Sequence, residues 1–207
     1  DIVVIYNAYD PVPMHETKEE IRQRRGISGF TVLSAGRFVP WKGFLGVMEA
    51  IAEVQKEIAG IHLILVGDGP IRKELETAAR DIGIGEIVTC TGALPREEVL
   101  SYMKAADLFV LNTGYESFAY LMLEAAALGT PIATTDIPGN REFLKEGVTA
   151  LLFPEGDTKR MARAIMRAHN DPALGARLAG AAGEIPKHLS RERLLKETET
   201  VLRSLVS

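Results

Sequence analysis

The sequence predicts an α/β fold with a doubly wound, Rossmann-like parallel sheet. Short runs rich in apolar and β-branched residues recur along the chain, and segments with helical periodicity separate them. The runs are nearly continuous in apolar residues, which is typical of strands buried on both faces of a sheet. No internal repeat or low-complexity tract breaks this alternation. The expected strands are 2–6, 30–35, 61–66, 86–91, 108–111, 131–135 and 149–153.

The segments between these runs predict crossover helices, and a terminal amphipathic helix follows the last of them. We expect one Rossmann-like domain over residues 1–186 and a C-terminal helix within 187–207. The expected helices are 16–25, 43–58, 70–82, 95–105, 118–128, 139–146, 157–169, 172–182 and 190–206.

Composition limits the classes of function. Hydrophobic residues make up 46% of the 207 residues and charged residues 25%, as in ordinary globular proteins. The net charge of −4 argues against a sequence-independent grip on nucleic acid. The lone Cys90 excludes an internal disulfide and fits a reducing cytoplasm. No apolar run reaches the ~18 residues that a membrane span needs. Because the chain opens without Met on an expected strand, we expect it to be a fragment.

The loop after the second expected strand carries two cations, Arg37 and Lys42, between glycines and a proline. Ligands of doubly wound sheets bind beyond the carboxyl ends of the strands, so such loops are the first candidates for a site. Arg offers a fork of donors to phosphate oxygens, and Lys offers a compact charge. Two solvated surface cations would explain the same spacing.

The loop after the third expected strand begins Gly67-Asp68-Gly69-Pro70, with Arg72 where a dinucleotide fingerprint has its third glycine. We therefore do not predict NAD binding. The segment is also a good tight turn with proline before a helix. A ligand approaching the backbone at Gly67 is the functional alternative.

The loop after the fifth expected strand is the most informative. Ser117 is a natural N-cap for helix 118–128, whose first backbone N–H groups would suit a phosphate. Glu116 would lie at the mouth of the loop. Glu124 lies within an apolar stretch of that helix, where an ionised carboxylate needs a hydrogen-bonding partner such as ligand hydroxyls. The alternative places Glu124 on an exposed edge.

A metal centre is not expected. The four histidines are scattered singly, and no Asp-x-Asp pair exists to hold a cation on a diphosphate. If a diphosphate binds, protein cations and helix N-termini would offset its charge.

Taken together, these loops resemble the C-terminal, donor-binding domain of the GT-B, family-4 (group 1) retaining glycosyltransferases. The most specific part of this resemblance is the pair Glu116 and Glu124, which have seven residues between them. The pair occurs in combination with Arg37 and Lys42. It covers nearly the whole chain. The matching segments are IYNAYD (5–10), SAGRFVPWKGF (34–44), LILVGDGP (63–70), TGALPREEV (91–99), 115–144 and GVTALLF (147–153).

The resemblance implies roles for individual residues. Arg37 and Lys42 would bind the donor diphosphate, Glu116 the transferred sugar, and Glu124 the ribose hydroxyls. Ala119 stands where the family usually has glycine, which implies a tighter approach of the sugar to the backbone. Backbone groups would supply the remaining contacts, those of Gly92, Ala93 and Leu94 to the base and those of Phe118, Ala119, Tyr120 and Leu121 to phosphate or sugar.

The resemblance also implies a metal-independent enzyme without a cofactor, whose donor is a nucleoside-diphosphate sugar and whose acceptor domain is absent from this chain. The C-terminal helix would then belong to the donor domain or pack toward that acceptor domain. A non-catalytic nucleotide-sugar-binding module is one alternative, and a GT-B epimerase or phosphorylase is another, although no phosphorylase cofactor-lysine motif is present. The base, the sugar, the acceptor, the oligomeric state and peripheral membrane association of the full enzyme stay open.

Overall fold

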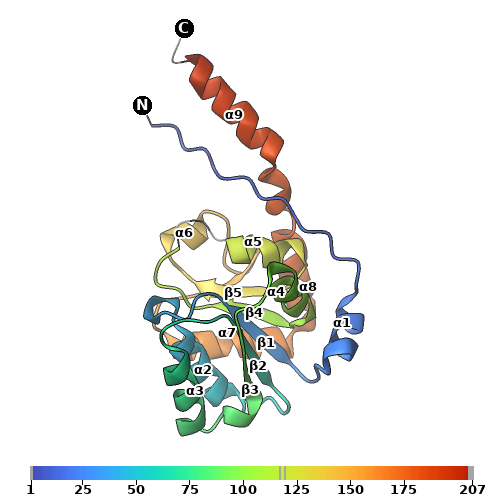
Figure 1. Ribbon diagram of the computed structural model, residues 1–207, viewed down its shortest axis with the longest axis vertical. Coiled ribbons are helices and arrows are strands. Elements are labelled where there is room, and N and C mark those ends of the chain that lie inside the picture. The colour runs from blue at the N-terminus through green and yellow to red at the C-terminus, as the bar shows by residue number, and fades with distance from the viewer. Residues whose placement is uncertain (1, 117, 119, 205–207) are drawn as a thin grey trace.

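The computed structural model describes residues 2–116, 118 and 120–204. Its centre is a parallel sheet of six strands in the order β3-β2-β1-β4-β5-β6. This doubly wound arrangement confirms the predicted fold class (Figure 1). The strands are β1 (Thr31–Ala35), β2 (His62–Val66), β3 (Val88–Gly92), β4 (Leu108–Leu111), β5 (Ile132–Thr135) and β6 (Leu151–Phe153).

Helices cover both faces of the sheet because successive strand residues point to opposite sides. Val32 packs in a core cluster with residues of α2, α3 and α7, whereas its neighbour Leu33 packs in a second cluster with residues of α4, α5 and α8. The bounds are α1 (Lys18–Arg25), α2 (Phe44–Val54), α3 (Arg72–Asp81), α4 (Arg96–Ala105), α5 (Tyr120–Ala127), α6 (Pro138–Arg141), α7 (Thr158–Asn170), α8 (Pro172–Ala182) and α9 (Arg191–Ser204), with 3₁₀ helices η1 (Pro40–Lys42), η2 (Gly85–Ile87) and η3 (Pro186–His188).

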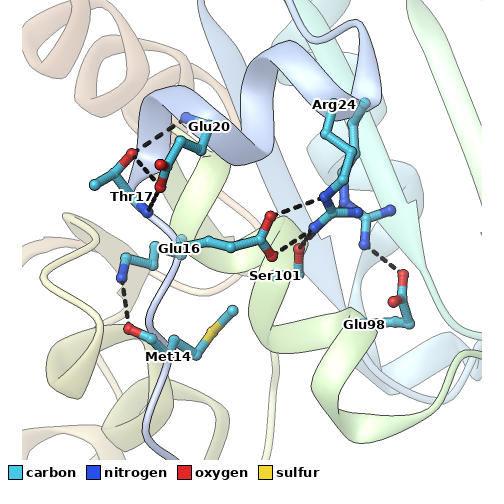
Figure 2. A network of polar contacts seen from close by, with 9 residues as sticks. Met14, Glu16, Thr17, Glu20, Arg24, Glu98 and Ser101 are labelled. Carbon is cyan, nitrogen blue, oxygen red and sulfur yellow. Dashed lines mark hydrogen bonds and ion pairs between the residues drawn. The ribbon is translucent and has the colours of Figure 1, made fainter.

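Helix α1 begins with a capping box and is held on α4 by polar contacts (Figure 2). The Glu20 side chain accepts a hydrogen bond from the Thr17 backbone N–H, while the Thr17 hydroxyl accepts one from the Glu20 backbone N–H. Arg24 forms an ion pair with Glu16 and donates a hydrogen bond to the Ser101 hydroxyl of α4. The chain before β1 is therefore fixed to the helix that follows β3.

The predicted strand at 2–6 is wrong. Ile2 is 95% exposed, and residues 2–6 pair with neither sheet edge. The segment instead runs in extended form beside α9, which projects away from the sheet (Figure 1). Arg193 of α9 donates a hydrogen bond of 2.8 Å to the Tyr6 carbonyl oxygen. An apolar run indicates extended backbone, but a strand also needs a pairing partner.

Helix 139–146 is shorter than expected, because α6 ends at Arg141 and the chain then turns. In that turn the Lys145 N–H donates to the Thr149 hydroxyl over 2.7 Å. The division at residues 186 and 187 stays a prediction. Among the described helices, none is long and apolar enough to cross a membrane.

Candidate functional site

The loops that carry the predicted site residues meet at the carboxyl edge of the sheet. Arg37 follows β1, Gly67 follows β2, and Gly92 ends β3. Parallel pairing of β1 with β2 and of β2 with β3 brings these strand ends together. A hollow of about 300 Å³ lies there. Its lining includes five of the predicted residues, Arg37, Gly67, Ala93, Leu94 and Leu121, which come from four separate parts of the sequence.

The glycines beside this hollow are explained by close backbone packing. Gly67 has φ +145°, and a Cβ built there would lie 1.9 Å from the Gly36 carbonyl oxygen. The Gly67 N–H also donates to the Gly92 carbonyl oxygen over 3.0 Å, extending the contact between β2 and β3. The floor of the hollow is therefore fixed backbone, and ligand contact at Gly67 stays a prediction.

Lys42 and Glu116 form an ion pair between the loops after β1 and β4. Lys42 lies in η1 after β1, Glu116 lies after β4, and 74 positions separate them in the sequence. The Lys42 Nζ is 2.8 Å from Glu116 Oε2, and the two side chains are 18% and 16% exposed. A cation and a carboxylate predicted from separate loops are thus brought into direct contact.

Two hydrogen bonds hold these two loops together. The Asn112 side-chain amide donates to the Gly43 carbonyl oxygen over 3.0 Å, and the Gly114 backbone N–H donates to the Trp41 carbonyl oxygen over 3.0 Å. Gly43 has φ +64°, and a Cβ built there would lie 2.1 Å from the Asn112 carbonyl oxygen. The placement of Lys42 beside Glu116 therefore depends on a glycine that ends η1.

Glu124 lies on the buried side of α5, so the alternative of an exposed edge is wrong. Its side chain is 9% exposed, and its Oε1 lies 2.7 Å from the Nε of Arg96, the first residue of α4. The sequence analysis did not identify Arg96. A buried carboxylate requires a partner, and the loop sequence after β3 offered an arginine as a candidate.

Tyr9 is a second residue that the sequence analysis missed, and it lies beside the Arg96–Glu124 pair. It is buried against Leu123 of α5 and Leu189, and its backbone N–H donates to the Leu189 carbonyl oxygen over 2.7 Å. Burial is the main cause that raises the pKa of Tyr9 to about 12. The negative charge of Glu124 contributes to that rise in pKa, and the Arg96 guanidinium opposes it.

The remaining predicted residues differ in their surroundings. Arg37 is exposed and forms no ion pair within the described part of the chain. Phe118 packs edge-on against Tyr120 and Phe143, and its carbonyl oxygen accepts the Tyr120 N–H over 2.9 Å. The amide of Tyr120 is therefore engaged in this structure. Helix α5 begins at Tyr120 rather than at residue 118. Ser117 and Ala119 lie outside the described residues.

The chain matches the family model described as glycosyl transferases group 1 over residues 17–184. It belongs to this family. Similar proteins include a lipopolysaccharide core biosynthesis glycosyltransferase, LpsE, of Rhizobium meliloti, 34% identical over 85% of this chain and 49% of that protein. An alpha-D-kanosaminyltransferase of Streptomyces kanamyceticus is 31% identical over 82% of this chain and 44% of that protein. This group 1 chain therefore spans about half the length of the curated relatives it matches.

Solved structures agree with this family assignment. The group 1 chain superposes on Anabaena Alr3699/HepE, solved in complex with UDP and glucose, with a TM-score of 0.87 and 25% identity over 98% of this chain and 57% of that one. The C-terminal domain of the group 1 protein LpcC from Francisella tularensis has the same fold, with a TM-score of 0.75 at 20% identity over 84% of this chain and 92% of that one. The predicted GT-B, C-terminal-domain assignment is confirmed.

Proposed function

We propose that this chain is the donor-binding domain of a retaining glycosyltransferase, which binds a nucleoside-diphosphate sugar at the carboxyl edge of its sheet. The observation that carries the proposal is the ion pair of Lys42 and Glu116, from loops 74 positions apart, at the same carboxyl edge of the sheet as the hollow that Arg37 lines. Sugar transfer is proposed for the whole protein, of which this chain spans the donor half.

Arg37 and Lys42 are the proposed diphosphate ligands. Arg37 has a free guanidinium within the described structure and lines the hollow, so it can take phosphate oxygens directly. Lys42 would exchange its contact with Glu116 for a phosphate oxygen. Stabilising negative charge on the departing diphosphate is the kind of electrostatic contribution that dominates many transfer reactions. These two cations would supply it.

Glu116 and Glu124 would then contact different parts of the donor. Glu116, at the mouth, would accept hydrogen bonds from the transferred sugar, and Glu124, deeper in α5, from the ribose hydroxyls. Backbone groups at Gly92, Ala93 and Leu94, at the end of the edge strand β3, would face the base. The acceptor and the rest of its binding site would come from the absent domain.

The proposed donor is tested by a thermal-shift screen of this chain against UDP, GDP and ADP and their sugar conjugates. A ligand that binds only the folded state raises the apparent stability, by about 2.7 kcal/mol at a hundredfold excess over Kd. UDP is the first nucleotide to test, because the Anabaena structure is described with UDP and glucose. No shift with any nucleotide at millimolar concentration would contradict the proposal.

Metal independence belongs to the same proposal. Within the described residues no group of three His, Cys, Asp or Glu side chains could hold a metal ion. We expect donor binding to survive EDTA, because Arg37 and Lys42 are proposed to offset the diphosphate charge. Loss of calorimetric binding on chelation, with recovery on adding Mg²⁺, would contradict this part of the proposal.

The alternative is a non-catalytic module that binds the nucleotide sugar at the same site but does not transfer the sugar. Measuring sugar transfer after adding the N-terminal part of the whole protein distinguishes this module from the enzyme. Release of free nucleoside diphosphate that depends on an acceptor supports the enzyme.

A further inference from the structure

Arg96 reaches from an exposed position onto a buried carboxylate. Its side chain is 55% exposed, whereas that of Glu124 is 9% exposed, and the Nε to Oε1 distance is 2.7 Å. Arg96 begins α4, directly after Ala93 and Leu94 of the proposed base-contacting loop. The pair therefore joins the loop after β3 to the middle of α5 at the edge of the proposed nucleotide site.

Arg96 is the ion-pair partner of Glu124. The neighbours of Glu124 along α5 are apolar or alanine, and Arg96 is the cation within ion-pair distance among the described residues. A carboxylate buried without a cation or hydrogen-bond donors is energetically costly. Arg96 therefore supplies the ion-pair partner that the Glu124 carboxylate needs in an apolar environment.

The geometry also leaves one carboxylate oxygen available. Arg96 contacts Oε1, and no described residue donates a hydrogen bond to Oε2. Tyr9 covers the pair from the side of Leu123 and Leu189, and its side chain is almost fully buried. A carboxylate oxygen that receives no hydrogen bond from the described residues is a strong acceptor for a ligand hydroxyl.

We propose that Arg96 is a positioning residue that makes the site selective for ribose: it fixes the Glu124 carboxylate through Oε1, so that Oε2 accepts a ribose hydroxyl. This inference rests on the proposed function and adds to it a residue that selects the sugar of the nucleotide. Arg96 acts through Glu124 and needs no contact with the nucleotide itself.

The test compares two ligands that differ only in the ribose hydroxyls. Calorimetry measures binding of UDP and of 2′,3′-dideoxy-UDP, and of the matching guanosine and adenosine pairs, to this chain and its variants. Arg96→Ala should lower the affinity for the ribonucleotide about tenfold, as expected when a well-positioned charged hydrogen-bond acceptor is lost. The affinity for the dideoxynucleotide should fall less than about twofold. Arg96→Lys keeps the charge and should recover most of the preference for ribose.

Arg160→Ala is the matched control, because Arg160 is an exposed arginine near the start of α7 that forms an ion pair with Asp157. Arg160→Ala should leave the affinity for both nucleotides unchanged. An equal loss of affinity for both nucleotides in Arg96→Ala would show a merely structural role, and an unchanged preference for ribose would also overturn the inference. Failure of every ribonucleotide to bind the unsubstituted chain would overturn the proposed function and this inference with it.

Discussion

Replacing Glu116 by glutamine should tighten binding of a nucleoside diphosphate and weaken binding of the corresponding nucleotide sugar. Glu116 Oε2 lies 2.8 Å from Lys42 Nζ. If Lys42 binds the diphosphate, it must leave or share that contact. Glu116→Gln keeps the shape of the side chain and removes its charge, so Lys42 becomes free to bind phosphate.

The expected change in affinity depends on the strength of the Lys42–Glu116 ion pair. Both side chains are mostly buried, at 18% and 16% exposed, but a glutamine oxygen can still accept a hydrogen bond from Lys42, so only the charge contribution is lost, about 0.2–1 kcal/mol. Its removal should tighten binding of the plain nucleoside diphosphate by about 1.4- to 5-fold. The nucleotide sugar should instead bind more weakly, because a hydrogen bond to the sugar that contributes about 1–3 kcal/mol is lost.

The assay is calorimetric titration of UDP and of a UDP-sugar into the same variant. Glu184→Gln is the control, because Glu184 pairs with Lys187 over 2.6 Å and lies beside η3, outside the loops that carry the proposed ligand contacts. It should alter neither affinity. If Glu116→Gln weakened UDP as much as the UDP-sugar, Glu116 would not be the sugar contact, and the exchange of Lys42 between carboxylate and phosphate would be refuted.

Three further outcomes are expected. Arg37→Ala and Lys42→Ala should each weaken nucleoside-diphosphate binding by about 1.5–3 kcal/mol in calorimetry, and unchanged affinity in both would make them solvated surface cations. Glu124→Gln should weaken UDP and UDP-sugar equally, by about 1–3 kcal/mol, and a loss confined to the sugar conjugate would contradict a ribose contact. Because the folded-state pKa of Tyr9 is raised to about 12 from 10.0, its contribution to the free energy of unfolding is complete below pH 10 and is lost as pH rises toward 12. Denaturation at pH 9, 10 and 11 should show a steeper loss in the unsubstituted chain than in Tyr9→Phe, and equal slopes would contradict the shift.

Periodicity alone predicted the sheet well, because its strands are buried on both faces and read as apolar runs. Expected and observed bounds of β1–β6 differ by at most two residues. The failure at 2–6 has a definite cause: the segment has the composition of a strand, but both sheet edges end without it. Pairing partners are a property of the tertiary structure, and local composition does not contain them.

The candidate site was predicted from residue types at strand ends and from the family resemblance. That reasoning placed Arg37, Lys42 and Glu116 in loops at one edge of the sheet, where the strands before them end, and Glu124 in the helix that follows β4. It missed Arg96 and Tyr9, which are 28 and more than a hundred positions from Glu124. The burial of Glu124 was suspected from its apolar neighbours, and the identity of its cation emerges only when α4 packs on α5.

The two ends of the described chain are tied together where they leave the sheet domain. Tyr9 hydrogen-bonds the Leu189 backbone, Asp10 pairs with Arg191 over 2.6 Å, and Arg193 holds the Tyr6 carbonyl. A displacement of α9 would therefore move residues 6–10 with it. Because Tyr9 lies in this segment and interacts with Arg96 and Glu124, such a displacement would act on the ion pair of the proposed nucleotide site.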